Sequence, residues 1–392
     1  MTIIYCTQIY FLDAAIEYVR LIASQGHKVH VTIELSSNQL KTNILDVETD
    51  LNKFAPLTSF EEVVDTWGLQ YLKLFFTECA SVNFVVYPSK KIRQTRKVAK
   101  VLGKHIDEIK PDFIHLDDFS SRTLFQLPNL FKNRKQLIAN IHDPLTHSGE
   151  FSLSRELYRK LWFNLIPSFV VFSEFSKTIL SPQIRNNKKI TVLKLMPYTV
   201  YKSFLKKSDK NKIASRKYIS FVGRISPYKG IELFMGAIEQ ILVKHPNTYF
   251  YIGGKSNADY NPSFLTIKNE NIIIENKFLS NSELVNIIEN SQLIVCPYID
   301  ATQSGVIMTA HALNCPVLVT PVGGLAEYIV SGKSGSVAKE TSALALKESI
   351  LQFIENNEFE SMKKSLNTKT FQNISVLNNL KEINILYSRK LV

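Results

Sequence analysis

Short apolar runs alternate with helix-length amphipathic segments along the first half of the chain. Residues 3–6 and 29–33 are two such runs, and the segment between them, 11–24, carries apolar residues at the spacing of a helix that faces a core. Further apolar runs lie at 113–116, 137–141 and 169–173. Because a strand, a crossover helix and a second strand build a parallel unit, this pattern predicts a doubly wound parallel sheet.

The same alternation restarts in the second half, after a basic stretch at 201–217 that has no clear apolar period. Short apolar runs then follow at 218–222, 249–252, 272–274, 293–296 and 317–320. Helix-length segments separate them, which is typical of a second Rossmann-like domain. We therefore expect an α/β fold with two Rossmann-like domains, 1–200 and 218–368, joined by a linker at 201–217. A final helix at 369–392 is expected to pack back toward the first domain.

The length of the chain supports two domains, and its net charge limits the kinds of partner. The chain has 392 residues, more than one hydrophobic core usually holds, and a formal net charge of +12. A basic balance favours an anionic partner, such as a phosphorylated substrate or a membrane surface, although a genome rich in lysine codons would produce the same balance. No nucleic-acid-binding signature is present, so no nucleic-acid partner is expected.

The cysteines and the N-terminus indicate the cytoplasm. Cys6, Cys79, Cys296 and Cys315 are far apart and include no CxxC pair, so neither a zinc site nor a disulfide framework is indicated. The first residues lack the basic start and cleavage site of a signal peptide. No run of about 18 apolar residues predicts a membrane span. We expect a cytoplasmic protein with free thiols.

The segment 89–110 is a strongly basic predicted helix. Its narrow apolar stripe, at positions 92, 98, 102, 106 and 109, is expected to face the core. Only Asp107 and Glu108 oppose its basic residues, which are Lys90, Lys91, Arg93, Arg96, Lys97, Lys100, Lys104 and Lys110. The basic face is either a solvated surface or a docking site for an anionic inner leaflet, where each cation adds about 1 kcal/mol.

The stretch FVGRISPYKG, which begins at Phe221, is the strongest local feature. A predicted strand ends at Gly223, where the missing side chain allows close approach to the backbone. Arg224 and Lys229 follow five positions apart, with Pro227 stiffening the turn between them. They form either a solvated surface pair or a site for one anion, and a diphosphate leaving group requires such charge stabilisation.

Other strand ends in the second half carry turns of small residues. The turn 302–306 follows an apolar strand and precedes a predicted helix, so its backbone N–H groups form an anion site at a helix N-terminus. Gly253-Gly254 and Gly323-Gly324 end two more strands. Ligands of such folds bind at the carboxyl ends of the strands. These turns, with two cations nearby, predict a phosphate-bearing ligand.

Three stretches carry a family resemblance, over about 218–354: FVGRISPYKGIE, NKFLSNSELVNIIENSQLIVCPY and ATQSGVIMTAHALNCPVLVTPVGGLAEYIVSGKSG. Together they resemble the donor domain of the group 1 glycosyltransferases, family 4 in the sugar-transferase classification, which have the GT-B fold. The resemblance implies two Rossmann-like domains facing across a cleft. It also implies transfer of a sugar from a nucleotide diphosphate sugar to an acceptor, with retention of anomeric configuration.

The resemblance also assigns donor-binding residues. It implies that Arg224 and Lys229 bind the diphosphate and that the segment around Phe278 packs on the nucleobase. Gly223 and Gly254 allow the backbone to approach the donor. The turn that offers backbone N–H groups to the phosphate and sugar is formed by Thr302, Gln303, Ser304, Gly305 and Val306.

The chain departs from the family pattern at two glutamates that usually lie eight positions apart. The second position is Thr309 here, and the first falls at Ala301, beside Asp300. The second glutamate usually holds the ribose hydroxyls, so Thr309 is the donor-binding candidate there. Asp300 is the candidate for the remaining carboxylate near the sugar. The wording ATQSGV resembles a branch that acts in bacterial surface polysaccharide synthesis.

The first half supplies a polar strand end, IHDPLTHSGE, which begins at Ile141. His142 is either a buried core histidine or a site residue; the resemblance places a histidine here that faces the donor sugar, where it hydrogen-bonds the sugar or acceptor. Asp143, His147 and Glu150 are the acceptor-binding candidates, although both acidic residues also fit loop capping. His115, which precedes Asp117 and Asp118 at another strand end, lines the same cleft or caps its loop.

These expectations combine into a glycosyltransferase of the hexosyltransferase type that acts on a glycan or lipid-linked acceptor. No DxD motif is present, so the enzyme is expected to need neither a metal nor another cofactor. Two alternatives stay open: a nucleotide-sugar epimerase of the same fold and a catalytically degenerate scaffold. The absence of a GxGxxG after the first strand argues against a dehydrogenase. The sequence leaves the nucleobase, the sugar, the acceptor and the oligomeric state undefined.

Overall fold

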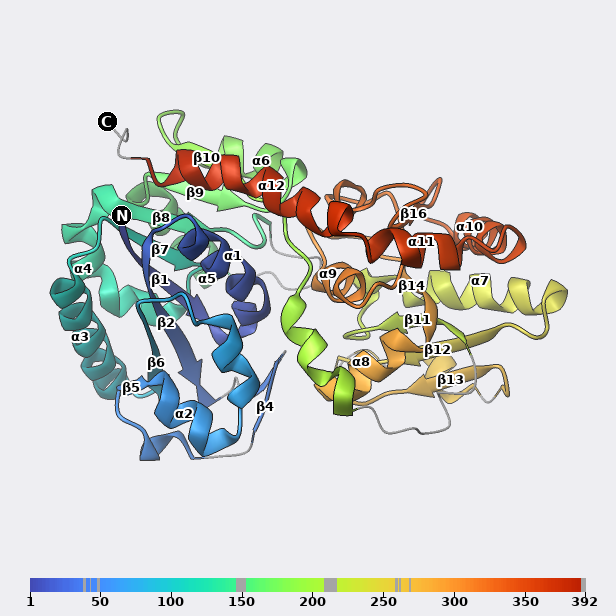
Figure 1. The fold of residues 1–392 in the computed structure, drawn as a ribbon, viewed down its shortest axis with the longest axis horizontal. Coiled ribbons are helices and arrows are strands. Elements are labelled where there is room, and N and C mark those ends of the chain that lie inside the picture. The colour runs from blue at the N-terminus through green and yellow to red at the C-terminus, as the bar shows by residue number, and fades with distance from the viewer. Residues whose placement is uncertain are drawn as a thin grey trace. The chain divides into compact units, whose positions relative to one another are not determined.

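The computed structural model describes residues 1–37, 40–42, 44–47, 50–145, 153–207, 217–257, 260, 262–267 and 269–388. They form two compact units, each built around its own sheet (Figure 1). The first unit contains 1–145, 153–194 and 376–388 with the gaps just given, and the second contains 195–375 likewise. The predicted α/β architecture with two parallel sheets is confirmed.

The first unit is built on a sheet in the order β10-β9-β8-β7-β1-β2-β6-β5. Its described strands are β1 (Thr2–Gln8), β2 (Lys28–Ser36), β5 (Leu57–Ser59), β6 (Ser81–Tyr87), β7 (Phe113–Asp117), β8 (Leu137–Asn140), β9 (Ser168–Val171) and β10 (Lys189–Val192). All neighbouring pairs are parallel except β5 with β6. A separate antiparallel pair is formed by β3 (Lys41–Thr42) and β4 (Leu45–Asp46). The central strand β1 is covered on both faces, which explains its apolar run at 3–6.

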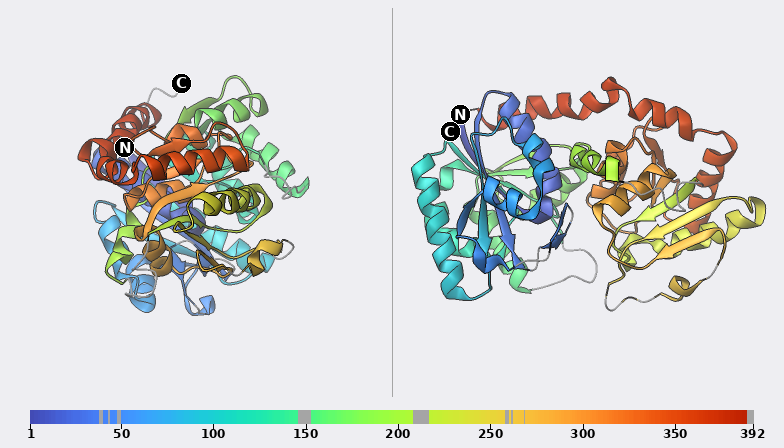
Figure 2. Two further views of the ribbon diagram at one scale, coloured as in Figure 1. Left: turned by 90° about the vertical axis from the view of Figure 1, so that its right-hand side faces the viewer. Right: turned by 60° about the horizontal axis from the view of Figure 1, so that its bottom comes forward.

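Helices cover both faces of this sheet. In Figure 1 and in the right-hand view of Figure 2, α3 lies on one side of the central strands and α1 on the other. The α-helices are α1 (Leu12–Ser24), α2 (Phe60–Trp67), α3 (Ile92–Ile109), α4 (Leu127–Lys132), α5 (Leu153–Leu165) and α6 (Glu174–Leu180). Short 3-10 helices are η1 (Ile9–Phe11), η3 (Leu51–Lys53), η4 (Gln70–Phe75), η5 (Ser121–Gln126), η6 (Arg134–Gln136) and η7 (Ser181–Gln183).

The second unit has a fully parallel sheet in the order β13-β12-β11-β14-β15-β16. Its strands are β11 (Tyr218–Val222), β12 (Tyr249–Gly253), β13 (Ile272–Glu275), β14 (Ser291–Cys296), β15 (Val317–Val319) and β16 (Gly335–Val337). The centre of the sheet therefore places the ends of β12, β11 and β14 side by side. These are the strand ends that carry the sequence motifs.

The helices of the second unit follow its strands. They are α7 (Ile231–Lys244), α8 (Asn281–Glu289), α9 (Gly305–Ala312), α10 (Ala343–Glu355) and α11 (Phe359–Leu366), with 3-10 helices η8 (Thr199–Lys207), η10 (Pro227–Lys229), η11 (Ser263–Thr266) and η12 (Leu325–Tyr328). A capping box starts α8: the Ser280 hydroxyl accepts from the Glu283 N–H at 3.3 Å, and the Glu283 carboxylate accepts from the Ser280 N–H at 2.8 Å. The pair α7 and α10 pack against each other.

The last helix, α12 (Lys369–Leu386), begins in the second unit and its later turns belong to the first. In the first unit the Asn379 side chain donates to the Lys194 carbonyl at 2.7 Å, and the Tyr387 hydroxyl lies 2.5 Å from Nδ1 of His115. None of the helices in the described ranges is long and apolar enough to cross a bilayer.

Three local expectations differ from the structure. The basic helix begins at Ile92 rather than 89, and Ile92 itself is 62% exposed because its helix reaches the core only from Thr95 onward. Residues 199–207, placed partly in the linker, form η8, in which Tyr201 and Phe204 are buried. The strands that were not predicted from the sequence are β3, β4, β5, β6, β10 and β16.

Candidate functional site

The loops after β11 and β12 touch at two glycines. Gly223 has φ 120° and Gly254 has φ 152°, a region that favours glycine. A Cβ on Gly254 would lie 1.8 Å from the Gly223 carbonyl oxygen, and a Cβ on Gly223 would lie 3.5 Å from the Val306 side chain. Any side chain at Gly254 would therefore separate the two loops. The predicted donor-binding residues Gly223, Gly254 and Val306 lie together.

Lys229 lies at the end of η10, beside the loop after β14. Its Nζ is 3.7 Å from the centroid of the Tyr298 ring, which is cation–π distance. The Tyr298 hydroxyl in turn lies 3.1 Å from the Ser304 hydroxyl. The loop is tied to η10 by the Ile299 N–H, which donates to the Tyr228 carbonyl at 2.8 Å. Lys229 is thus held next to the turn that precedes α9.

The turn before α9 has the form expected of an anion site. Thr302 and Ser304 are buried, whereas Gln303 and Val306 are half-buried and Gly305 is exposed. Ser304 is the N-cap residue of α9, but its side chain makes no capping hydrogen bond. The first N–H groups of α9 are consequently not capped by that hydroxyl, and the positive end of the helix dipole lies at this turn.

The remaining donor-side candidates differ in exposure. Arg224 directly follows Gly223 and is exposed, and Phe278 is 43% exposed between β13 and α8. Asp300 is half-buried in the loop that carries Tyr298. Thr309 is buried, and its hydroxyl donates to the Gly305 carbonyl one turn earlier at 3.0 Å. That hydroxyl therefore has its proton engaged within α9, which leaves it only as an acceptor toward a ligand.

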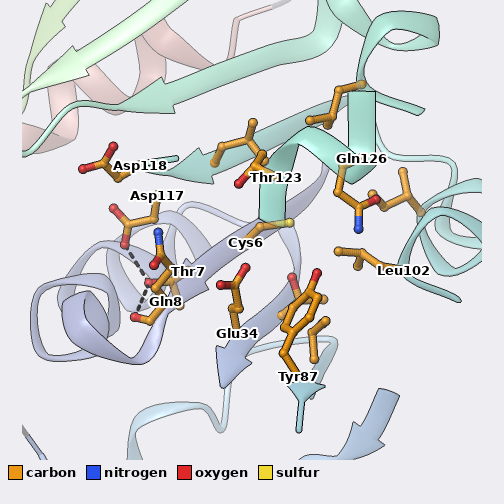
Figure 3. Close-up of a pocket in the computed structure, with 15 residues that line it drawn as sticks. Cys6, Thr7, Gln8, Glu34, Tyr87, Leu102, Asp117, Asp118, Thr123 and Gln126 are labelled. Carbon is orange, nitrogen blue, oxygen red and sulfur yellow. Dashed lines mark hydrogen bonds between the residues drawn. The ribbon is translucent and has the colours of Figure 1, made fainter. Parts of the chain in front are cut away.

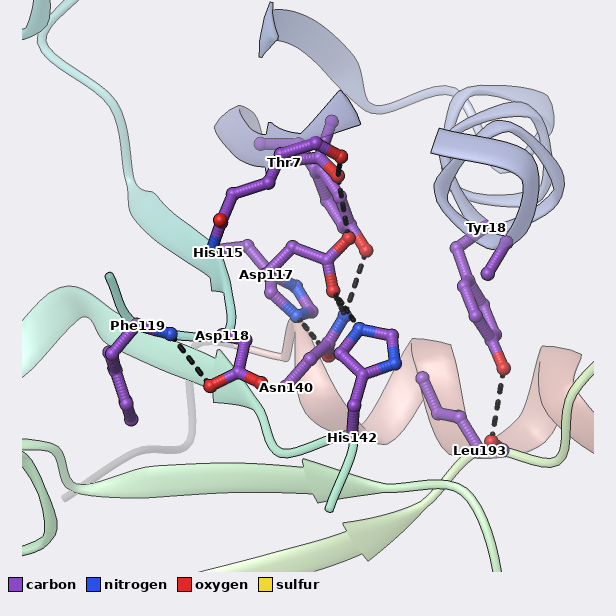
Figure 4. A network of polar contacts seen from close by, with 12 residues as sticks. Thr7, Tyr18, His115, Asp117, Asp118, Phe119, Asn140, His142 and Leu193 are labelled. Carbon is purple, nitrogen blue, oxygen red and sulfur yellow. Dashed lines mark hydrogen bonds and ion pairs between the residues drawn. The ribbon is translucent and has the colours of Figure 1, made fainter. Parts of the chain in front are cut away.

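In the first unit, polar residues from three neighbouring strands and the loop after them form a buried network (Figure 4). Asp117, at the end of β7, accepts from the Thr7 hydroxyl at 2.7 Å and from the Asn140 amide at 2.8 Å. Its Oδ1 also lies 2.7 Å from Nε2 of His142. His115 extends the network, with its Nε2 2.7 Å from the Asn140 oxygen.

His142 is held in one orientation by this network and by aromatic rings. Its ring stacks on Phe11, with centroids 3.7 Å apart and planes 7° apart, and Phe172 lies 4.7 Å away. Burial alone would lower the pKa of His142, but the charge and hydrogen bond of Asp117, with Asp118, raise it above its usual value. Burial would raise the pKa of Asp117, but His142 and its other hydrogen-bond donors lower it. The pair therefore favours imidazolium and carboxylate.

The residues near His142 and Asp117 differ from this pair in their hydrogen bonds and in their pKa. Asp118 has φ 65° and accepts from the Phe119 N–H at 2.7 Å, and burial raises its pKa to about 6. Asp143 is half-buried, and its carbonyl accepts from Arg159 at 2.9 Å. Burial lowers the pKa of His115 to about 4, so His115 is neutral in the network. The acceptor candidates His147 and Glu150 lie outside the described residues.

The sequence singled out His142 but not its partners. Thr7 and Asn140 were missed, and Asp117 was noted only as the neighbour of His115. Their positions in the sequence could have identified them. Thr7 lies near the carboxyl end of β1, Asp117 ends β7 and Asn140 ends β8, and these three strands are neighbours in the sheet. Polar residues that end adjacent parallel strands converge on the same edge.

Metal ligands do not cluster in the described ranges, where no group of three or more histidines, cysteines, aspartates or glutamates is positioned around one point. The four cysteines are free thiols. Burial raises the pKa of Cys6 to about 11, which keeps this thiol protonated.

Sequence comparison with known proteins finds a family match in the second unit. Residues 203–370 match the family model of the glycosyl transferases group 1. The D-inositol 3-phosphate glycosyltransferase of Corynebacterium glutamicum is 25% identical over 150 residues, which cover 36% of this chain and 36% of that protein. The chain thus spans about a third of the length of this curated relative. The matched region supports a glycosyltransferase-type function.

Solved structures share the whole architecture at low identity. A glycosyltransferase from Rickettsia africae has a TM-score of 0.62 at 16% identity, covering 99% of both chains. Anabaena HepE in complex with UDP-glucose has a TM-score of 0.61 at 14% identity, covering 98% of this chain and 99% of that one. The UDP-GlcNAc 2-epimerase of Neisseria meningitidis has a TM-score of 0.53 at 17% identity, covering 96% and 98%. The fold is GT-B, which both transferases and epimerases use.

Proposed function

We propose that the protein is a glycosyltransferase that binds a nucleotide diphosphate sugar on its second unit and its acceptor on its first. The observation that carries the proposal is the set of adjacent strand ends in the second unit. Gly223 and Gly254 bring two loops into contact, and Lys229 lies beside the turn that opens α9. A pyrophosphate requires close backbone approach, a helix N-terminus and cations. The group 1 family match covers the same residues.

Within this site, Arg224 and Lys229 bind the diphosphate and the turn 302–306 binds phosphate and sugar oxygens. Phe278 offers an exposed ring for the nucleobase, and Asp300 provides the carboxylate near the sugar. UDP is the nucleotide we favour, because the Anabaena structure of the same fold holds UDP-glucose. Because Arg224, Lys229 and α9 supply the positive charge, the reaction is proposed to need no metal and no other cofactor.

In the first unit, His142 contacts the sugar or the acceptor hydroxyl, and Asp143 helps to bind the acceptor together with His147 and Glu150. The orientation of the His142 ring is fixed by Asp117 and Phe11. This supports the role proposed for His142, because a side chain of the site must be held in place before the substrate binds. Retention of configuration, membership of family 4 and a role in bacterial surface polysaccharide synthesis in the cytoplasm rest on the sequence resemblance.

A nucleotide-sugar epimerase is the second candidate, since the Neisseria epimerase has the same fold. It would invert a centre of the donor sugar without an acceptor. The carboxyl of Asp118, whose pKa is raised to about 6 by burial, is a group of the kind that epimerisation uses as acid or base. A degenerate scaffold, the third candidate, is supported by Thr309 in place of the family glutamate.

Binding and turnover with a panel of nucleotides test the proposal. UDP at about 100 times its dissociation constant is expected to stabilise the protein by about 2.7 kcal/mol in thermal unfolding, and GDP and ADP are expected to stabilise it less. Incubation with UDP-sugars and candidate glycans should then release UDP in excess EDTA as well as without it.

The panel also separates the alternatives. A sugar epimer formed with the nucleotide bond intact would identify an epimerase. Nucleotide binding without any turnover would identify a scaffold. No stabilisation by any nucleotide would refute the proposal.

A further inference from the structure

A small cavity lies among the strand ends of the first unit (Figure 3). The neighbouring strands β7, β1, β2 and β6 contribute to its lining, together with α3, η5 and α4. The apolar part is formed by side chains such as Leu102, Ile106 and Leu130, and the polar part by Glu34, Gln126 and the aspartates that end β7. It is therefore a largely apolar cavity with a few polar groups, at the edge of the sheet where ligands of this architecture bind.

The size of the cavity limits its occupant. Its volume is about 50 Å³, above the roughly 10–15 Å³ that a cavity needs to hold one water molecule. A pocket for a whole small-molecule ligand has about 300–1,000 Å³. The cavity therefore fits one substituent of a larger molecule, of the size of a hydroxyl or hydroxymethyl group.

Gln126 provides the strongest sign that the cavity binds something. This side chain is only 5% exposed, and neither its amide nitrogen nor its amide oxygen has a hydrogen-bond partner among the described residues. Figure 3 shows it extending from η5 toward Leu102 and Tyr87. The Tyr87 hydroxyl is the side-chain hydrogen-bond neighbour of this amide, but their contact falls outside ordinary hydrogen-bond geometry. A buried unpaired amide costs about 1–3 kcal/mol, and a hydroxyl group satisfies both of its atoms at once.

The charges of the lining exclude an anion. The described residues that line the cavity include no cation. Arg122 pairs with the lining residue Glu34, with its Nε 2.7 Å and its second terminal nitrogen 2.5 Å from the carboxylate. Arg122 also stacks over the Tyr87 ring at 5.1 Å. Asp117 and Asp118 add two more carboxyl groups to the lining. Carboxylates accept hydrogen bonds from hydroxyl groups and repel phosphate.

We propose that this cavity binds a neutral, hydroxyl-bearing substituent of a sugar acceptor and discriminates against an acceptor that is phosphorylated there. The unpaired Gln126 amide and the carboxyl groups of Glu34 and Asp118 are its specificity-determining groups. The inference rests on the proposed function, because it takes the first unit as the acceptor-binding unit. It adds the chemical class of the acceptor, which the family match does not supply.

Paired saccharides test the discrimination. Saturation-transfer NMR on the whole protein compares D-glucose with D-glucose 6-phosphate and myo-inositol with myo-inositol 1-phosphate. At least one neutral member is expected to bind, and its phosphorylated partner should bind about 10-fold more weakly or not at all. Equal or tighter binding of the phosphorylated members, or no binding of either neutral compound, would overturn the inference.

Two variants assign the effect to the cavity. Gln126→Leu removes the unpaired amide, so we expect unchanged or higher stability together with about a 10-fold loss of neutral saccharide binding. Glu34→Gln frees Arg122, so the preference for the neutral member should shrink about 10-fold. The exposed substitutions Gln25→Leu and Glu61→Gln are matched controls that should change neither binding nor preference.

UDP stabilisation of the same variants separates this inference from the proposed function. If UDP binds and Gln126→Leu keeps its saccharide signal, the cavity inference is wrong and the proposed function stands. If UDP stabilises no variant, the proposed function is wrong, and the saccharide comparison still decides what the cavity binds.

Discussion

Asp117 lies in the interior of the first unit and accepts hydrogen bonds from the side chains of Thr7 and Asn140 while it contacts His142. A buried carboxylate is stable only when paired in this way. The network therefore fixes both the charge and the orientation of His142. We regard Asp117 as a positioning residue, because it acts on the proposed reaction through the imidazole.

Replacement of this carboxylate should have a pH-dependent cost. The pKa of His142 is raised above 6.5 in the fold, so its contribution to stability is present below 6.5 and is lost as the pH rises through the raised value. The pKa of Asp117 is lowered below 3.8, so its contribution is present above 3.8 and is lost as the pH falls through the lowered value. Both residues therefore contribute fully to stability between about pH 3.8 and pH 6.5.

Asp117→Asn should accordingly lower the free energy of unfolding by about 2 kcal/mol at pH 5, and by less at pH 9. Urea unfolding at the two pH values measures this difference. Asp107→Asn, which removes an exposed ion pair with Lys132, is the matched control and should show little effect at either pH. An equal loss for Asp117→Asn at pH 5 and pH 9 would contradict the assigned pairing.

The role of a single residue was predictable from the sequence only where the residue type allows few conformations or contacts. Gly223 and Gly254 were identified because strand-end glycines mark close backbone approach, and both have positive φ. Asn140 and Thr7 were not identified, because a polar residue at a strand end gains meaning only from the neighbouring strand. That neighbour is distant in sequence, since Thr7 and Asp117 are 110 positions apart.

At the scale of elements, α3 is the most distinctive helix of the first unit. Its core face is formed by Thr95, Val98 and Ile106, while its basic side chains are exposed. Only Lys104 and Lys132 form ion pairs with its two acidic residues in the described contacts. The basic face and the exposed Ile92 support the proposal that this helix docks on an anionic membrane that carries a lipid-linked acceptor.

Charge reversal tests that proposal. The triple variant Arg93→Glu, Arg96→Glu, Lys97→Glu should weaken binding to phosphatidylglycerol vesicles by about 100-fold or more, because each cation contributes about 1 kcal/mol. The matched control reverses three exposed lysines of the second unit, Lys244, Lys333 and Lys339. Vesicle co-sedimentation that is the same for both triple variants would remove the membrane role.

The regular elements were predictable where a single periodicity covers them. The strands β1, β7 and β11 each contain a short, mostly apolar run, because parallel strands that are buried on both faces need mainly apolar residues. The strand β5 was not predictable in this way, since it has only three residues and pairs antiparallel at the sheet edge. The helix η8 lies in a basic stretch, and burial of Tyr201 and Phe204 depends on tertiary contacts.

At the scale of the whole molecule, the two units have the same architecture but different chemistry at their strand ends. The second unit presents glycine turns, a helix N-terminus and basic residues, which suit a pyrophosphate. The first unit presents carboxyl groups, amides and His142, which suit hydroxyl groups. The proposal that the second unit binds the donor and the first unit the acceptor rests on this contrast and on the family match, since the low-identity structural relatives show the fold alone.

We assign donor binding to the second unit, whereas turnover also requires the first. Four variants test this assignment. For each, calorimetric titration measures UDP binding, and release of UDP from the UDP-sugar that the wild-type protein turns over measures activity. Arg224→Ala and Lys229→Ala should each weaken UDP binding by about 10-fold or more, as the loss of a charged hydrogen bond of about 1.5–3 kcal/mol implies. His142→Ala should keep UDP binding within about twofold of wild type while turnover falls about 100-fold. Lys244→Ala, at the exposed end of α7, should change neither. Full UDP affinity in Arg224→Ala and Lys229→Ala, or unchanged turnover in His142→Ala, would refute these assigned roles.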